Sequence, residues 1–266
     1  MYAFDYVRPA SLADAVKALG ASEENRPLAG GQTLIPTMKQ RLAMPASLID
    51  LAGVAELRGI RRDGNAVVIG AMTTHADVAA NADVRAVIPA LAALAGGIGD
   101  PHVRNSGTIG GSIANNDPAA DYPAAVLALG ATIITTTREI PADSYFAGLF
   151  RTALQPGELI KAVKFPAAMK AGYSKFEQRA SRYALIGVFV AQSAAGVRVA
   201  VTGSGATGVF RASALEAALA KAFTVDALKG VSVPATGLLS DIHGSAEYRA
   251  SVIPVITERA VAKALG

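Results

Sequence analysis

The sequence has 266 residues, a formal net charge of +4 at pH 7 and no cysteine. Without cysteine the chain has no disulfide, no thiol nucleophile and no thiolate ligand for an iron–sulfur cluster. The basic residues are scattered along the chain, which argues against a nucleic-acid-binding surface. Hydrophobic residues make up 52% of the sequence, and many of them are alanine. No stretch of the chain reaches the roughly 20 consecutive apolar residues that a membrane span requires.

The first part of the chain, about residues 1–57, is predicted to alternate short helices and strands. In SLADAVKALG the apolar residues recur at the spacing of one helix face, with Ser11 placed to cap the helix and Gly20 placed to end it. A short apolar run, two glycines and a polar-capped apolar segment follow in RPLAGGQTLIPTMKQR. ASLIDL is typical of a short buried strand, so this part is an α/β unit.

The second part, about residues 58–166, mixes strands with alanine-rich helices. NAVVIGAMTT is rich in β-branched residues and predicts a strand, and DVRAVIPALAALAGGIG predicts a helix interrupted at Pro89. DYPAAVLALGATIITTT predicts a helix, a stop at Gly130 and a strand. GELIKAVKFP predicts one more strand.

The third part, from about residue 170 to 266, begins with three strand-like segments, GYSKFEQRAS, YALIGVFVAQSA and GVRVAVTGSG. Their short connections predict an antiparallel meander. Two amphipathic helices follow, in ASALEAALAKAF and in SAEYRASVIPVITERAVAKALG, the second with a kink expected near Pro254. Strands followed by helices indicate a separate α+β domain.

Two glycine segments carry most of the chemical information. LAGGQTL (28–34) and TIGGSIA (108–114) share an apolar lead, a Gly-Gly pair and then a hydroxyl or amide residue. Paired glycines permit positive φ and close approach to a ligand, and successive backbone N–H groups in such a turn bind anions. Thr33 and Ser112 can add hydroxyl donors. Together the segments predict two anion-binding turns that suit a pyrophosphate, although either alone is more often a plain turn.

Other nucleotide-binding and metal-binding schemes are disfavoured. Neither glycine segment matches the dinucleotide fingerprint G-x-G-x-x-G or the P-loop. His75, His102 and His243 lie far apart and form no metal-binding pattern, so no metal site is predicted, and His102 is expected at the surface or at an interface. The opening residues have no basic stretch followed by an apolar one, so a cytoplasmic location is expected.

The sequence resembles the FAD-binding medium subunits of molybdenum hydroxylases, such as carbon monoxide dehydrogenase, and the flavin domain of xanthine dehydrogenase. The motifs that carry the resemblance are PLAGGQTLIPTMKQRLAMPASLIDL, IGAMTTHADV, GGIGDPHVRNSGTIGGSIANNDPAADYPAAVLALGA and SDIHGSAEYR. They cover nearly the whole chain in the order of the family. The resemblance implies an α+β fold with a two-subdomain FAD-binding domain of the vanillyl-alcohol-oxidase (PCMH) type at 1–57 and 58–166. A C-terminal α+β domain with an antiparallel sheet and helices would follow at 170–266.

The resemblance also implies which residues contact FAD. One side of the pyrophosphate would lie against Ala29, Gly30, Gly31, Gln32 and Thr33. The other side would lie against Thr108, Ile109, Gly110, Gly111 and Ser112. Asp121 would accept a hydrogen bond from a ribose or adenine group, Ile98 and Ile160 would line the flavin or adenine, and Tyr183 would cover one face of the isoalloxazine. The family often has histidine and serine where this chain has Gln32 and Thr33, which keeps the hydrogen-bonding capacity.

Several of these residues have structural alternatives. Ile98 and Ile160 are equally suitable for a core, and Tyr183 for a half-buried position in a strand. Asp121 can cap the helix that begins at YPAAVLAL, a role that does not exclude a cofactor contact. The stretch Asn115–Asp117 is typical of a turn.

The function implied by the resemblance is electron transfer through FAD. Substrate would be oxidised on a large molybdopterin subunit, and electrons would pass through the [2Fe–2S] clusters of a small subunit to this FAD. The external acceptor would be NAD⁺, a quinone, oxygen or another carrier, and the complex would be a dimer of heterotrimers. Two alternatives remain: a self-contained flavin oxidoreductase, and an assembly subunit that has lost FAD.

Overall fold

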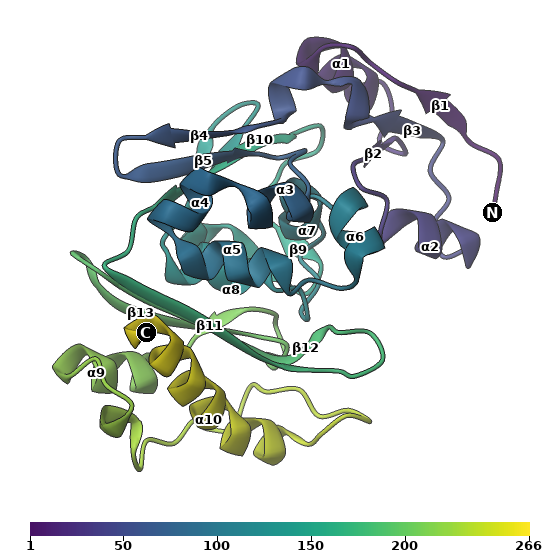
Figure 1. The fold of residues 1–266 in the computed structure, drawn as a ribbon. Coiled ribbons are helices and arrows are strands. Elements are labelled where there is room, and N and C mark those ends of the chain that lie inside the picture. Colours follow the sequence, from purple (N-terminus) through teal and green to yellow (C-terminus); the bar gives the residue numbers. More distant parts are fainter.

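The computed structural model describes all 266 residues and contains four β-sheets surrounded by helices (Figure 1). Three sheets follow one another along the chain, and we call them the N-terminal, middle and C-terminal sheets. The fourth is a hairpin of β8 (Phe146–Gly148) and β9 (Arg151–Thr152). None of the helices combines the length and the hydropathy that crossing a membrane requires.

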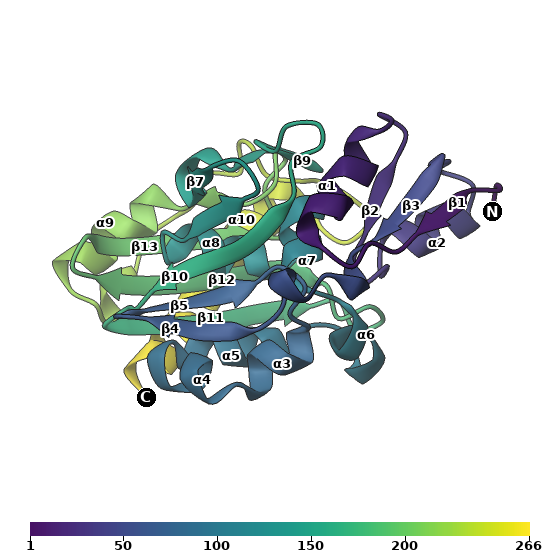
Figure 2. The same cartoon turned by 90° about the horizontal axis from the view of Figure 1, so that it is seen from above.

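The N-terminal sheet is small and parallel, in the order β1-β3-β2, and it projects from the rest of the molecule (Figure 2). Its elements are β1 (Asp5–Val7), α1 (Leu12–Gly20), β2 (Arg26–Leu28), α2 (Leu34–Lys39) and β3 (Ser47–Asp50). As predicted, Ser11 caps α1, because its Oγ accepts a hydrogen bond from the N–H of Asp14 at 3.1 Å. The predicted stop at Gly20 is wrong by one residue, since Gly20 still belongs to the helix and Ala21 is its C-cap.

The middle sheet is antiparallel, in the order β4-β5-β10-β6-β7. Its strands are β4 (Ile60–Asp63), β5 (Ala66–Gly70), β6 (Thr132–Thr135), β7 (Glu139–Pro141) and β10 (Ile160–Pro166). The helices that accompany it are α3 (His75–Ala80), α4 (Ala82–Val87), α5 (Pro89–Gly96), α6 (Pro101–Ser106), α7 (Ile109–Asn115) and α8 (Tyr122–Ala128). Short 3₁₀ turns occur at Leu51–Gly53, Ala55–Leu57, Ala142–Ser144 and, later in the chain, Asp226–Leu228.

Two breaks predicted in this region are confirmed. Pro89 separates α4 from α5 and stands at the start of α5, where its missing N–H costs no intrahelical bond. Gly130 follows α8 with φ +62°, a left-handed conformation that glycine adopts without strain, and the chain then enters β6.

The C-terminal sheet confirms the predicted antiparallel meander, in the order β11-β12-β13-β14. Its strands are β11 (Lys170–Glu177), β12 (Ala184–Ser193), β13 (Gly196–Thr202) and β14 (Phe210–Arg211), and the helices α9 (Ser213–Lys221) and α10 (Ala246–Leu265) follow. The helix α10 runs through Pro254 as one element.

Both faces of the C-terminal sheet are buried. Because side chains alternate along a strand, Phe189 and Ala191 of β12 pack into the core around α5 and α8, whereas Val188 and Val190 pack into the core with α9 and α10. Figure 1 shows the sheet between these two layers of helices. The helix α8 is buried along its whole length as a result.

The three sheets lie in residues 5–50, 60–166 and 170–211. Hydrophobic packing continues across the boundaries between these regions. Met72 and Leu159 of the middle region, for example, pack with Ile49 and Leu51 of the N-terminal region. The domain limits at residues 57 and 166 therefore stay a prediction.

Candidate functional site

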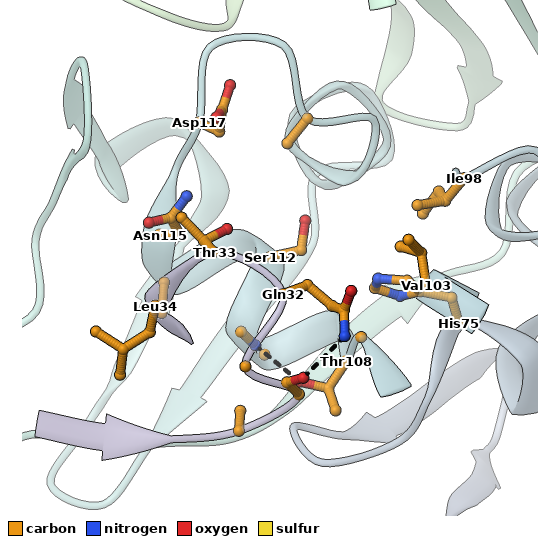
Figure 3. Close-up of a pocket in the computed structure, with 18 of the residues that line it drawn as sticks. Gln32, Thr33, Leu34, His75, Ile98, Val103, Thr108, Ser112, Asn115 and Asp117 are labelled. Atoms are coloured by element: carbon orange, nitrogen blue, oxygen red, sulfur yellow. Dashed lines mark hydrogen bonds between the residues drawn. The ribbon is translucent and has the colours of Figure 1, made fainter. Parts of the chain in front are cut away.

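A cavity of about 430 Å³ lies where the three sheet regions meet. Its walls come from the first glycine segment, from the start of α7 and from the turn before β12, which are far apart in the sequence. Every residue for which the resemblance implies a contact with FAD lines this cavity except Ile109. Figure 3 shows Gln32, Thr108 and Ser112 near its centre, with His75, Val103 and Ile98 on one side and Asn115 and Asp117 on another.

The first glycine segment presents a series of free backbone donors. The N–H groups of the five residues from Gly30 to Leu34 have no partner in the protein. Gly31 has φ +70°, and the segment then enters α2. Thr33 is exposed, and its hydroxyl also has no partner. The segment therefore has the free donors that the predicted turn requires, and these can face a group carrying several oxygen atoms, while anion binding itself stays a prediction.

Close packing places this segment against the second one. A Cβ on Gly30 would lie 2.2 Å from the carbonyl oxygen of Ser106 and 2.7 Å from the Cα of Gly107, so only glycine fits. A Cβ on Gly111 would lie 3.4 Å from the Cβ of Ala29. The two glycine segments thus form adjoining walls of one cavity.

The second glycine segment is not the turn that the sequence predicts. It begins α7, with Thr108 as the N-cap residue. The N–H groups of Ile109 and Gly110 donate to the carbonyl oxygens of Thr73 and Ala71, and those of Gly111 and Ser112 donate to Thr108. No free N–H remains from Ile109 to Ser112, because α7 packs tightly against the end of β5. What this wall offers instead is the unpartnered hydroxyl of Ser112, together with the small size of its glycines.

Ile109 is fully buried in the core behind the wall, and Gly110 packs against Ala71, where a Cβ would come within 2.6 Å of the Cβ of Ala71. The structure therefore does not place the side chain of Ile109 at the cavity. Ile98 is half-buried and Ile160 is buried, and both line the cavity while packing on the core. Ile98 and Ile160 therefore both line the cavity, as the resemblance implies, and belong to the hydrophobic packing, as the alternative predicts.

Asp121 belongs to a buried polar cluster at the cavity wall. Its Oδ1 accepts a hydrogen bond from the hydroxyl of Tyr173 at 2.5 Å and lies 3.0 Å from Nζ of Lys175. Burial raises the pKa of the Asp121 carboxyl, against the opposing effects of the Lys175 charge and the Tyr173 hydrogen bond. Burial, and then the contact with the Asp121 carboxylate, raise the pKa of Tyr173 well above its ordinary value. Asp121 does occupy the N-cap position of α8, but its carboxylate is engaged here and makes no capping bond to the backbone of the helix.

Lys175 joins three walls of the cavity. Besides Asp121, its Nζ donates to the carbonyl oxygens of Gly97 at 3.0 Å and Arg182 at 2.9 Å. Gly97 precedes Ile98, and Arg182 precedes Tyr183. The ammonium group of Lys175 therefore holds the backbone next to both Ile98 and Tyr183.

Tyr183 lies in the turn before β12 rather than within the strand, and 48% of it is exposed. Its N–H donates to Ser181 Oγ at 3.3 Å, and its carbonyl oxygen accepts from the N–H of Gln178 at 2.8 Å. Partial burial and the nearby Asp117 and Asp121 raise the pKa of its hydroxyl. The ring therefore stands as a neutral aromatic surface at the edge of the cavity.

Sequence reasoning did not assign some residues that line the cavity. Asn115 and Asp117 line it beside Asn116, whose φ of +46° confirms the predicted turn. His75 also lines it, and the sequence marks this residue only as part of the motif IGAMTTHADV, which carries the family resemblance. His102 is exposed and does not line the cavity, which agrees with its predicted surface position.

Comparisons with known proteins identify the family of this chain. Residues 2–168 match a family model described as the FAD binding domain in molybdopterin dehydrogenase. The carbon monoxide dehydrogenase medium chain of Hydrogenophaga pseudoflava is 35% identical over 274 residues, which cover 97% of this chain and 96% of that one. The nicotine 6-hydroxylase medium subunit of Paenarthrobacter nicotinovorans is 35% identical over 98% of this chain and 97% of its own length.

Solved structures give the same result. The reconstituted CO dehydrogenase from Oligotropha carboxidovorans has a chain that superposes with a TM-score of 0.89 at 36% identity, covering 99% of this chain and 98% of that one. The fold and the site thus define an oxidoreductase subunit with a flavin-binding domain, and the predicted α+β architecture is confirmed. The chain belongs to the FAD-carrying medium subunits of the molybdenum hydroxylases. FAD is the cofactor of this subunit, and the molybdenum and iron–sulfur cofactors belong to other subunits of such complexes.

Proposed function

We propose that this chain accepts electrons from the [2Fe–2S] clusters of a small partner subunit and passes them through FAD to an external acceptor. A large molybdopterin subunit would oxidise the substrate. The complex would be a cytoplasmic dimer of heterotrimers that binds no nucleic acid. The observation that carries the proposal is the row of free N–H groups from Gly30 to Leu34 inside a cavity bounded by three parts of the chain.

The residues present fit the pyrophosphate of FAD. Phosphate oxygens accept hydrogen bonds and carry negative charge, and the donor set of residues 30–34 supplies backbone N–H groups without any competing carboxylate in the segment. Ala29, Gly30, Gly31, Gln32 and Thr33 would hold one side of the pyrophosphate. Thr108, Gly110, Gly111 and Ser112 would close the other, with the Ser112 hydroxyl as the donor.

The remaining residues of the cavity shape the rest of the site. Ile98 and Ile160 would provide an apolar lining, and Tyr183 would cover one face of the isoalloxazine. Asp121 would act through its cluster, since its carboxylate holds Lys175 and Lys175 holds the backbone beside Ile98 and Tyr183. Bound FAD supplies the redox chemistry, and the chain supplies position and exclusion of water.

The first test is the absorption spectrum of the purified full chain, alone and with its partner subunits. We expect flavin bands at one FAD per chain. A protein that is colourless in both forms and cannot be reconstituted with FAD would contradict the proposal and favour an assembly subunit.

The second test is purification of the native complex with metal and flavin analysis. We expect molybdenum and iron to accompany the flavin. A flavin-containing chain that purifies without partners, and that turns over a substrate alone, would instead support a self-contained flavin oxidoreductase.

A further inference from the structure

The imidazole of His75 is a buried polar group without a partner in the protein. The residue is only 5% exposed, and neither ring nitrogen makes a hydrogen bond within the chain. Buried polar side chains are nearly always paired, because an unpaired donor or acceptor loses its hydration without compensation. His75 also lines the cavity that we assign to FAD.

The two ring nitrogens of His75 have different surroundings. Nδ1 is fully enclosed, on a ring that packs against Tyr122 with 5.4 Å between the ring centroids. Nε2 lies beside Gly107, where a Cβ would approach it to 2.6 Å. Nε2 makes no hydrogen bond within the chain, yet it is not one of the fully enclosed atoms, so it is the ring nitrogen that can face the cavity. Figure 3 shows the ring beside Val103, extending toward Gln32.

The charge state of His75 follows from its position. Burial and the nearby Arg104 lower the pKa of the imidazole to about 4, so the ring is neutral at pH 7. A neutral imidazole carries one N–H donor and one acceptor nitrogen, and it offers a hydrogen bond rather than an ion pair.

Packing also places His75 close to the free donors of the first glycine segment. Gly30 lies against Ser106 and Gly107, and Gly107 lies against the imidazole. The ring is therefore separated from the first glycine segment by a single residue. A ligand that fills the space between the two glycine segments passes within reach of Nε2.

We propose that Nε2 of His75 donates a hydrogen bond to an oxygen of bound FAD, in the stretch of pyrophosphate and ribityl chain next to the glycine segments. This inference rests on the proposed function of the cavity. His75 would then be a cofactor-binding residue in addition to those that the family resemblance implies.

The test compares three variants of the full chain, alone or in its complex, after removal of FAD. His75→Leu removes the hydrogen bond, and His75→Gln replaces it with an amide N–H at a similar distance. His102→Leu is the matched control, because His102 is exposed and lies outside the cavity. FAD affinity is measured by titration, and thermal unfolding of each FAD-free protein is recorded separately.

We expect His75→Leu to weaken FAD binding about tenfold, His75→Gln to stay within about threefold of wild type, and His102→Leu to bind as wild type does. In ¹⁵N-labelled wild-type protein, the Nε2 resonance of His75 should shift when FAD is added. Unchanged affinity in His75→Leu, or an Nε2 resonance that does not move, would overturn the inference.

If His75→Leu does not fold, the nitrogen resonance of the wild type decides alone. Wild-type protein that binds no FAD in any form contradicts the proposed function itself. By contrast, if the wild type binds FAD and His75→Leu binds it equally well, only the inference about His75 is contradicted.

Discussion

Lys175 and Asp121 form a buried ion pair, with 3.0 Å between Nζ and Oδ1, across the boundary between the C-terminal sheet and α8. Both side chains are nearly inaccessible, at 8% and 5% exposure. Two further carbonyl contacts of Lys175 fix the backbone beside Ile98 and Tyr183. A single charge therefore links the packing of the C-terminal sheet to the shape of the cavity.

Lys175→Met should destabilise the protein by about 3–5 kcal/mol, because it leaves the Asp121 carboxylate buried without its counter-charge. FAD retention should fall as well. Denaturant unfolding and flavin content measure the two effects. The matched control is Lys164→Met, since Lys164 pairs with Asp63 at 2.7 Å but both side chains are more than 40% exposed. That control should change stability by less than about 1 kcal/mol, and equal losses in both variants would contradict the role given to Lys175.

Two glycine variants should separate cofactor binding from folding. Gly31→Ala forces a residue with a Cβ into φ +70°, which costs about 1–2 kcal/mol and redirects the N–H groups that face the cavity. Gly110→Ala places a Cβ 2.7 Å from the carbonyl oxygen of Ala71, so α7 must move at a cost of about 1–3 kcal/mol. We expect Gly31→Ala to lower FAD affinity at least about tenfold while most of the protein remains folded. Gly110→Ala should chiefly lower the unfolding temperature, and the reverse pattern would be inconsistent with these roles.

Ser112→Ala should weaken FAD binding about three- to tenfold, because the hydroxyl is the free donor that the start of α7 presents to the cavity. Titration of FAD-free protein measures the change. Ser106→Ala is the control, since Ser106 is exposed and outside the cavity lining. Equal affinities of the two variants would remove Ser112 from the set of cofactor contacts.

Glu158 should confer a pH dependence on stability that is independent of FAD. Arg138, with hydrogen bonds from Thr135 and Thr137, lowers the pKa of Glu158 to about 2 in the folded protein, from an ordinary value of 4.5. The carboxylate therefore stabilises the fold fully above pH 4.5, and this contribution is lost as the pH falls toward 2. We expect Glu158→Gln to be less stable than wild type at pH 7 and to approach it at pH 2 to 3 in denaturant unfolding. A constant difference between wild type and variant would contradict this explanation.

Local patterns were enough to predict much of this fold. The cap at Ser11, the break at Pro89, the stop at Gly130 and the meander of β11 to β13 each depend on a few neighbouring residues. The resemblance added the family and the cofactor, and it directed attention to the two segments that line the cavity.

The features of the site that the sequence did not predict depend on contacts between residues that are far apart in the chain. The sequence could not distinguish a free turn at Gly110 from a helix start, because the carbonyl oxygens of Thr73 and Ala71, far away in the chain, accept the N–H groups of Ile109 and Gly110. Asp121 meets Tyr173 from 52 positions away, so its capping role was the simpler local interpretation. Nothing near His75 in the sequence indicates that Gly107 would lie against its ring.

The parts of the chain that form the cavity wall also bear on when the cofactor can be bound during protein synthesis. The two glycine segments lie before residue 115, but Lys175 and Tyr183 emerge from the ribosome only with the C-terminal sheet. Since domains fold in order from the N-terminus during synthesis, a nascent chain would present the free N–H groups of residues 30–34 well before the wall that we propose encloses the flavin ring. Under the proposed function, we expect the flavin to be loaded late in the maturation of this subunit, and we expect a chain truncated after the middle sheet to bind FAD without retaining it.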